Sequence, residues 1–271
     1  MTNQFESSNP LALVTGASSG IGKEFAIKLA SGQSAFNHKH DLIIVARNEN
    51  RLNEVKEDLE FSYGVSVEVI PADLETTKGI ALMKERFKDR SRSIDVLINN
   101  AGYGYSGNFG EVELKHSIGQ INLNVKALVS LTYFAIESMR QSGEGYILNV
   151  SSVAGFMPAP TSAIYAATKA FVTNFSQGIR EEISDTGIKL TCLCPGFTRT
   201  EFQDRANVDQ RNIPGFMWQN VGQVVDAGLN GLARNHGLVT PGIHNKLLVS
   251  TTHAIPSDVL RTIAGLVARR L

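Results

Sequence analysis

Short runs that are apolar throughout alternate with longer amphipathic stretches along most of this 271-residue chain. Residues 11–14 read LALV and residues 42–45 read LIIV, without the polar alternation of a half-exposed strand. Strands of this kind are buried on both faces, as in a parallel sheet covered by helices. Further strands are expected at 65–70, 96–98, 146–150 and 188–193, and helices at 22–31, up to 59, about 112–140 and 162–185. The alternation predicts an α/β fold, a Rossmann-type doubly wound parallel β-sheet flanked by helices on both faces.

Composition limits the partners such a fold can have. With 42% hydrophobic residues, the chain can bury one sizeable core, so residues 1–271 are expected to form a single domain. Lys and Arg total 26 and Asp and Glu total 26, which gives no basic surface for nucleic acid. Residues 1–10 lack the pattern of a secretory signal, and no apolar run approaches the roughly 18 residues of a membrane span. We expect a soluble, cytoplasmic protein.

The two cysteines give no sign of a disulfide framework or a metal site. Cys192 and Cys194 lie two apart in a predicted strand, and we expect them to point to opposite faces. Two thiols without a nearby histidine are poor zinc ligands, so no metal is predicted.

Residues 31–39 form a polar connection between the first helix and the second strand that is longer than usual. We interpret it as a surface insertion away from any ligand.

A glycine-rich turn joins the first predicted strand to the first predicted helix. Residues 15–22 read TGASSGIG, with glycines at 16, 20 and 22. Such glycines permit a tight turn and close backbone approach to a pyrophosphate, which the helix N-terminus then favours. The spacing differs from G-x-G-x-x-G, and a purely structural turn is the alternative interpretation. Its position between a strand and a helix favours dinucleotide binding.

The residue after the second strand bears on which dinucleotide binds. Arg47 follows this strand, where a carboxylate would bind the ribose 2′-hydroxyl of NAD(H). An arginine there can bind a 2′-phosphate instead, and a charge-assisted hydrogen bond of about 1.5–3 kcal/mol would favour NADP(H). Arg51 lies one helical turn further and could assist. The alternative is that Arg47 is simply a solvated charge.

A tyrosine and a lysine lie on one face of a later predicted helix. Tyr165 and Lys169 are four residues apart. Acid–base work by a phenol at neutral pH requires a lower pKa than its usual value near 10, and an adjacent ammonium favours the phenolate. A phenol tuned in this way could protonate a carbonyl oxygen as a hydride reaches the carbon.

Other polar groups end at the same edge of the predicted sheet. Ser152 follows the fifth strand, 13 residues before Tyr165. Asn99–Gly102, which reads NNAG, ends the fourth strand, and Pro195-Gly196 ends the sixth. Because the carboxyl ends of parallel strands form the ligand-binding crevice, these groups are expected to meet there.

Together these motifs resemble the short-chain dehydrogenase/reductase family in order and spacing over about residues 10–200. The resemblance implies that Tyr165 is the proton donor or acceptor, that Ser152 orients the substrate oxygen, and that Lys169 holds the nicotinamide ribose and lowers the tyrosine pKa. The family's asparagine, which maintains a water-linked proton path to the lysine, corresponds to Asn122 or Asn124, and counting back from the end of the helix favours Asn124.

The resemblance also implies an NADP(H) site, with Thr200 binding the carboxamide and Asp73 near the adenine. A surface helix cap is the alternative role for Asp73. The residues expected to contact the cofactor are Gly16, Ser18, Ser19, Gly20, Ile21, Gly22, Arg47, Asp73, Leu74, Asn100, Ala101, Gly102, Tyr165, Lys169, Pro195, Gly196, Thr198 and Thr200.

The sequence constrains the identity of the substrate less than it constrains the type of reaction. Residues 201–220 correspond to the family's substrate lid and carry several large apolar residues, and Tyr105 and Phe156 could face the same pocket. The sequence resembles broad-specificity reductases that border the 3-oxoacyl thioester and 17β-hydroxysteroid reductases, but it lacks the C-terminal glycine pair of acyl-carrier-protein reductases. We expect a hydrophobic ketone, aldehyde or 3-oxoacyl-type substrate; alternatively, the lid residues only pack against each other.

Two further expectations concern partners. Residues 256–271 have the spacing of a docking helix, with membrane-surface association as the less favoured interpretation. The resemblance implies a homodimer or homotetramer formed through two long helices. The alternative function from another class is a non-catalytic NADP(H)-binding sensor or scaffold protein.

Overall fold

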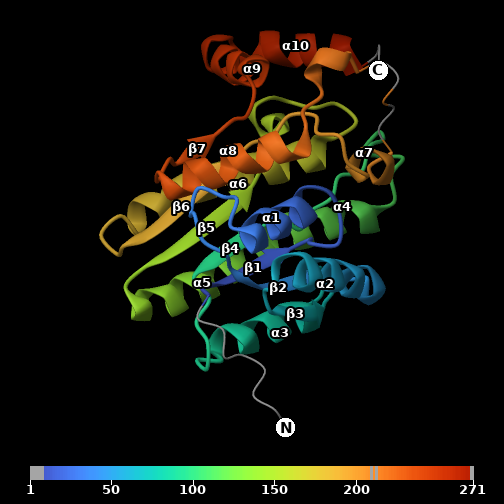
Figure 1. Ribbon diagram of the computed structural model, residues 1–271. Coiled ribbons are helices and arrows are strands. Elements are labelled where there is room, and N and C mark those ends of the chain that lie inside the picture. The colour runs from blue at the N-terminus through green and yellow to red at the C-terminus, as the bar shows by residue number, and fades with distance from the viewer. Residues whose placement is uncertain (1–8, 208–209, 211–212, 269–271) are drawn as a thin grey trace.

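A computed structural model describes residues 9–207, 210 and 213–268. The described residues form a seven-stranded sheet in the order β3-β2-β1-β4-β5-β6-β7, and every paired strand is parallel (Figure 1). The strands are β1 Leu11–Thr15, β2 Asp41–Ala46, β3 Val67–Pro71, β4 Val96–Asn99, β5 Gly145–Val150, β6 Ile188–Leu193 and β7 Leu238–Val239. The strand order reverses beside β1, so the crevice above β1 and β4 is the topological switch point where ligands bind.

Helices connect the strands and cover both faces of the sheet. They are α1 Gly20–Ser31, α2 Glu49–Tyr63, α3 Thr77–Lys88, α4 Leu114–Ile121, α5 Leu128–Ser142, α6 Ala163–Glu182, α7 Phe202–Arg205, α8 Val221–Ala233, α9 Ile243–Ala254 and α10 Ser257–Ala268. Shorter turns are the π-helical segment Asn122–Ala127 and the 3-10 turns Val153–Phe156 and Gly215–Met217. The predicted doubly wound α/β architecture is confirmed.

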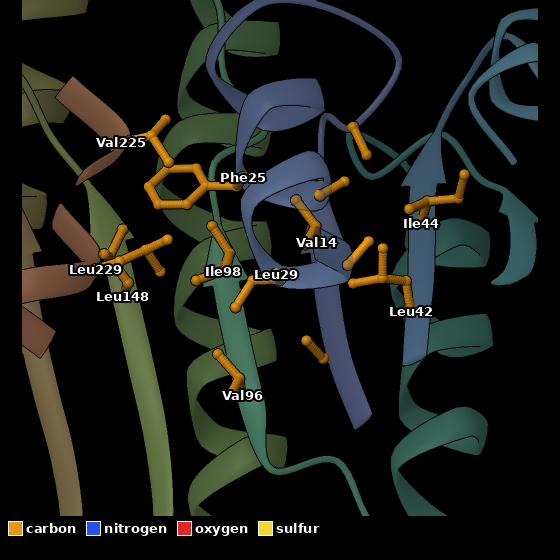
Figure 2. Packing of buried hydrophobic residues seen from close by; sticks show 14 of the residues in the cluster. Val14, Phe25, Leu29, Leu42, Ile44, Val96, Ile98, Leu148, Val225 and Leu229 are labelled. Atoms are coloured by element: carbon orange, nitrogen blue, oxygen red, sulfur yellow. The ribbon is translucent and has the colours of Figure 1, made fainter. Parts of the chain in front are cut away.

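The two faces of the sheet bury two separate cores. Side chains alternate along each strand, so Val14 of β1 faces α1, α2 and α8, whereas Leu13 faces α3, α5 and α6. Figure 2 shows Phe25 and Leu29 of α1 against the first face, with Val225 and Leu229 of α8 beside them. Burial on both sides explains why the strands carry no polar alternation.

Several predicted elements differ from the structure in their bounds; the helix expected to end at 59 is α2, which continues to Tyr63. The third strand is Val67–Pro71 rather than 65–70. The single helix expected at about 112–140 is instead α4, a π-helical segment and α5. Apolar periodicity alone gives little sign of a π-helical turn, because the turn keeps the chain helical while it inserts a residue.

The expected orientation of the cysteines is wrong. Residues two apart on a strand point to the same face, and the Sγ atoms of Cys192 and Cys194 lie 3.8 Å apart. Both thiols are free and buried beneath α6. They fill space next to the helix that carries Tyr165 and Lys169.

The connection at 31–39 enters the amino end of β2, opposite the crevice. Gly32 ends α1 in the left-handed conformation, with φ 72°. Phe36 then packs edge-on against Tyr146 of β5, with ring centroids 4.9 Å apart, and against His40 at 5.4 Å. The segment therefore covers the amino end of the sheet as well as being a surface connection.

His40 gives the fold a pH-dependent stability. It is 1% exposed, and burial together with the neighbouring His38 lowers its pKa to about 4. The folded chain then binds fewer protons than the unfolded chain between pH 6.5 and about 4, so stability falls as the pH falls through this window. The loss from this group should reach about 3 kcal/mol at the acid end.

Urea unfolding at several pH values checks this prediction. Other groups also titrate in this range, so the measured quantity is the difference from a His40→Phe variant, which keeps a ring and loses the titration. The wild type should lose more stability than the variant as the pH is lowered. Parallel pH curves for the two proteins would contradict the assignment.

The C-terminal part contains elements that the sequence interpretation did not predict. β7, α8 and α9 complete the sheet edge and its cover, and α9 and α10 lie at one end of the molecule (Figure 1). Helix α10 falls within the expected helix at 256–271, of which residues 269–271 lie outside the described part. The predictions for residues 1–8 and for parts of the expected lid at 208–209 and 211–212 also lie outside the described part.

Within the described residues, no helix has the length and apolar character needed to span a membrane.

Candidate active site

The carboxyl ends of β1, β4, β5 and β6 meet at one edge of the sheet, as predicted. The register places Val14 beside Ile98, Asn99 beside Asn149, and Val150 beside Leu193. The glycine turn, the NNAG segment, Ser152 and Pro195-Gly196 therefore leave the sheet at the same edge.

The glycine turn is packed too closely for side chains. Gly16 has φ +69°, and a Cβ on Gly22 would lie 2.2 Å from the Gly16 carbonyl oxygen. Ser19 is the N-cap residue of α1, but its side chain makes no capping hydrogen bond. Ser18 and Ile21 complete the turn and the first residues of the helix. The open helix N-terminus offers backbone N–H groups to an anion, so the turn fits a dinucleotide pyrophosphate.

Thr15 and Asn100 fix the position of this turn. The Thr15 hydroxyl accepts hydrogen bonds from the backbone N–H groups of Asn100 and Ala101, both at 3.0 Å. The Asn100 amide donates to the Thr15 carbonyl oxygen at 3.0 Å. Thr15 was not predicted as a site residue, although its position at the end of β1, before the first glycine, is the signal that could have indicated it.

Each of the two arginines considered for the 2′-phosphate is paired with a carboxylate. Arg47 follows β2 with its side chain 68% exposed, and its Nη1 lies 3.4 Å from a Glu75 oxygen. Arg51 Nη1 lies 2.9 Å from a carboxylate oxygen of Glu201 at the start of the lid. Exposed pairs of this kind are weak, so a phosphate could replace either carboxylate as the partner.

Asp73 and Leu74 follow β3 at the same edge. The Asp73 carboxylate accepts a hydrogen bond from the backbone N–H of Glu75 at 3.0 Å, and Leu74 is buried in the core. The cap of α3 is Thr76, whose hydroxyl accepts from the Gly79 backbone N–H, so the alternative role of Asp73 as the helix cap is wrong. Desolvation and the nearby Asp73 raise the pKa of Glu75.

The end of β5 holds Lys169 at two points. Lys169 Nζ donates to the Val150 carbonyl oxygen at 2.9 Å, and the Ser151 hydroxyl donates to the Lys169 carbonyl oxygen at 2.7 Å. Gly155, in the turn after β5, lies against α6 so closely that a Cβ would be 2.7 Å from the Ala170 nitrogen. These contacts fix the register of α6 on the sheet, and Ser151 was not predicted to take part.

Tyr165 lies one turn before Lys169, with the Lys169 ammonium 5.7 Å from its ring centroid. Desolvation raises the pKa of Tyr165 to about 12, against the opposing effect of a hydrogen bond with Ser152. Burial lowers the pKa of Lys169 to about 8. In the structure the pKa of Tyr165 is therefore raised rather than lowered, because desolvation of the phenol dominates and the Lys169 ammonium hydrogen-bonds to Val150. The role of Lys169 in favouring the phenolate stays a prediction.

Asn124 lies in the π-helical segment and joins three parts of the site. Its Oδ1 accepts from the Tyr103 backbone N–H at 3.1 Å, and its Nδ2 donates to the Tyr103 carbonyl at 2.9 Å and to Thr168 Oγ1 at 3.0 Å. A Cβ on Gly102 would lie 3.0 Å from Asn124 Oδ1 and 3.4 Å from Lys169 Nζ. The π-helical turn therefore directs Asn124, rather than Asn122, toward the backbone beside Lys169.

Part of the segment expected to form the lid packs against Tyr165. The Phe202 ring of α7 lies 5.6 Å from the Tyr165 ring, and Gly104 leaves room for both, since a Cβ there would be 3.1 Å from the tyrosine. Tyr105 instead stacks on His116 at 4.3 Å, and Phe156 packs beside the core formed by Leu128 and Val172.

The loop after β6 closes the crevice from the other side. Thr200 lies against Gly20, where a Cβ would be 3.2 Å from it, and its hydroxyl accepts from the Phe202 backbone N–H at 3.2 Å. Thr198 is buried, and its hydroxyl donates to the Gly196 carbonyl at 3.0 Å. The Ser152 hydroxyl donates to the Pro195 carbonyl at 3.4 Å.

Among the described residues, no three His, Cys, Asp or Glu side chains gather as metal ligands would.

Known proteins share this architecture and sequence. The chain is 32% identical over 209 residues to an uncharacterized oxidoreductase of Staphylococcus epidermidis, covering 75% of this chain and 86% of the relative. Its fold is similar to a short-chain dehydrogenase from Sphingobium yanoikuyae in complex with NADPH, with a TM-score of 0.80 and 39% identity over 87% of this chain and 89% of that one. It also resembles a bulky-bulky ketone specific alcohol dehydrogenase from Comamonas testosteroni, with a TM-score of 0.77 and 33% identity over 92% and 94% of the two chains.

The model of one protein family covers most of the chain. It is the family described as short chain dehydrogenase, and it matches residues 10–211. This range contains the glycine turn, Asn124, Ser152, Tyr165 and Lys169. The chain belongs to the short-chain dehydrogenase family of oxidoreductases.

Proposed function

We propose that this protein is an NADP(H)-dependent oxidoreductase that interconverts a hydrophobic ketone, aldehyde or 3-oxoacyl-type compound and its alcohol. The observation that carries the proposal is the joint position of Ser152, Tyr165 and Lys169 beside the glycine turn. A non-catalytic NADP(H)-binding scaffold needs only the glycine turn, whereas reduction of a carbonyl by hydride also needs a proton donor at the carbonyl oxygen.

The chain's own residues would handle the proton. When bound, NADPH would supply the hydride for the carbonyl carbon, and the Tyr165 hydroxyl would give its proton to the carbonyl oxygen. Ser152 would hydrogen-bond the same oxygen and hold it near the phenol. With a pKa near 8, Lys169 is mostly charged at neutral pH and favours the phenolate that remains. Asn124 would keep the Tyr103 backbone and Lys169 in register.

The fit of the cofactor rests on observations at both ends of the crevice. At Gly16 and Gly22 the backbone packs so closely against Asn100 and the turn itself that no side chain fits, and the tight turn leaves the backbone N–H groups at the start of α1 to bind a pyrophosphate. Arg47, exposed after β2, would bind the 2′-phosphate in place of Glu75. The similar Sphingobium yanoikuyae dehydrogenase is in complex with NADPH, which supports the same cofactor here.

The apolar cover of Tyr165 supports a hydrophobic substrate. Phe202 packs on the phenol ring, and Ile213 is buried in the lid segment. A substrate that displaced Phe202 would meet an apolar wall next to the proton donor. Similarity to an alcohol dehydrogenase specific for bulky-bulky ketones agrees with this choice.

Assembly as a homodimer or homotetramer is also part of the proposal. Tyr133 on α5 and Phe171 on α6 are 63% and 42% exposed, and Phe171 stacks on Phe175 at 5.7 Å. Such aromatic side chains on neighbouring helices are typical of a surface that pairs with a second copy. A molar mass of one chain in light scattering would contradict this assembly.

Turnover over a panel of carbonyl compounds tests the function. Purified protein is mixed with NADPH or NADH and steroid ketones, 3-oxoacyl thioesters, aldehydes, diketones and quinones, and cofactor oxidation is followed. We expect turnover with at least one hydrophobic carbonyl and a preference for NADPH. Tight NADPH binding without any turnover would instead favour a sensor or scaffold.

Replacing Arg47 with glutamine should change the cofactor preference. Loss of a charged hydrogen bond to the 2′-phosphate is expected to reduce the ratio of kcat/KM for NADPH to that for NADH by about 10-fold to 100-fold. Folding stability should stay unchanged, because the exposed pair with Glu75 contributes little. Arg90→Gln, at another exposed arginine, is the control. An unaltered ratio would remove Arg47 from the proposed site.

A further inference from the structure

Three buried carboxamide side chains surround the loop that follows β6. Gln203 of α7, Gln219 before α8 and Asn245 of α9 are 6%, 8% and 3% exposed. They come from three separate segments and converge on residues 195–199, and we call them the carboxamide collar. Burying an amide side chain is costly unless its hydrogen bonds are made, so the collar's arrangement is specific rather than incidental.

Gln219 is the centre of the collar. Its Oε1 accepts a hydrogen bond from the Gly196 backbone N–H at 3.2 Å and a second from Asn245 Nδ2 at 2.9 Å. Its backbone N–H donates to the Phe197 carbonyl at 2.8 Å, and its carbonyl accepts from the Arg199 backbone N–H at 3.2 Å. One residue therefore holds the loop through both its side chain and its backbone.

Asn245 supports Gln219 from behind. Its Nδ2 also donates to the Pro241 carbonyl at 2.9 Å, so both of its N–H groups are used. Gly196 is small enough to lie against it, since a Cβ there would be 2.4 Å from Asn245 Nδ2. The contact joins α9, which lies beyond the family-matching residues 10–211, to the Pro195-Gly196 turn.

Gln203 adds an observation that points to a ligand. Its Nε2 donates to the Thr198 carbonyl at 3.2 Å, which fixes the direction of the amide. Within the described part of the chain, its buried Oε1 receives no hydrogen bond. An acceptor left open beside this loop suits an N–H group supplied from outside the protein.

We propose that Gln219 and Asn245 are positioning residues for the nicotinamide end of the cofactor, an inference that rests on the proposed function. They fix the Pro195–Arg199 loop, which faces Ser152 through Pro195 and leads directly into Thr200, the residue that lies against the glycine turn. A loop held in this way presents its backbone to the cofactor without a reordering cost on binding. Removing either side chain leaves buried polar groups unpaired and lets the loop move.

The direct test is the dissociation constant of NADPH, measured by quenching of Trp218 fluorescence. Trp218 is the only tryptophan in the chain, and it lies next to Gln219 and 5.8 Å from the Phe197 ring. Gln219→Leu removes the acceptor of two hydrogen bonds and should weaken NADPH binding roughly tenfold or more. Gln219→Glu keeps an oxygen at the accepting position and should stay within about threefold of the wild type.

Asn245 offers a test that depends on pH. Asn245→Asp introduces a carboxylate that faces two acceptors, Gln219 Oε1 and the Pro241 carbonyl, so NADPH binding should weaken at about pH 8. At about pH 6 the protonated carboxyl can donate again, and binding should recover in part. Asn245→Leu, which cannot donate at either pH, should show no recovery.

Thr191→Val is the matched control. Thr191 lies on β6, the strand that precedes the loop, and the change removes its part-buried 2.7 Å hydrogen bond to the His236 carbonyl without touching the loop. It should lower stability and leave the NADPH dissociation constant unchanged. Equal weakening in Thr191→Val and Gln219→Leu, or none in Gln219→Leu, would overturn the positioning role. Failure of the wild type to bind NADPH would instead overturn the proposed function.

Discussion

Replacement of Tyr165 with phenylalanine is expected to lower kcat/KM for carbonyl reduction by about 100-fold to 10,000-fold. The ring and its contact with Phe202 remain, and only the proton donor is lost. Because the pKa of Tyr165 is raised to about 12, the phenol carries its proton throughout the neutral range. NADPH binding should change little, within about threefold.

Steady-state kinetics and a binding titration on the same samples separate these effects. Tyr146→Phe is the control, since this tyrosine lies on β5 at the opposite edge of the sheet and packs through its ring. It should keep wild-type activity. If Tyr165→Phe retained more than about a tenth of the activity, another group would have to supply the proton.

Gly22→Ala should abolish cofactor binding and also weaken the fold. The added methyl group would lie 2.2 Å from the Gly16 carbonyl oxygen and 2.5 Å from Asn100 Nδ2. Both neighbours are held by β1 and β4, so the clash can be relieved only by moving the turn or α1. Overpacking of this kind costs about 1–3 kcal/mol, and the displaced turn would no longer present its N–H groups to a pyrophosphate.

Urea unfolding and NADPH titration measure both effects. The control is Gly178→Ala, at a glycine in α6 whose added Cβ would meet nothing within 4 Å. This change should stabilise the protein by up to about 1 kcal/mol, because alanine is the better helix former. If Gly22→Ala bound NADPH as the wild type does, the proposed location of the pyrophosphate would be wrong.

The fold could be predicted because burial on both faces of the sheet leaves a direct record in the sequence. Strands such as β2 are apolar at successive positions, since α1 covers one side of the sheet and α3 the other. The positions of Ser152 and Pro195 could be predicted for a related reason. Each follows an apolar strand, and parallel strands bring their carboxyl ends together.

Features that depend on tertiary contacts could not be predicted. The π-helical turn that holds Asn124 leaves no mark in apolar spacing, and Ser151 does not differ in sequence from an ordinary hydroxyl near a strand end. The raised pKa of Tyr165 could not be predicted, because sequence spacing shows the charge of Lys169 but not the desolvation of Tyr165. The carboxamide collar depends on α9, which reaches the site only through the fold.

The two-point attachment of Lys169 to β5 has a consequence for how this enzyme could change its substrate. Val150 and Ser151 hold the lysine, and neither belongs to the lid. Substitutions or insertions in the described lid residues, such as Phe202, can therefore remodel the pocket while the proton-transfer geometry is retained. Libraries built on the lid should yield many active variants with altered selectivity, whereas libraries on the end of β5 should yield few active ones. The sheet keeps the chemistry constant, and evolution or engineering can vary the specificity around it.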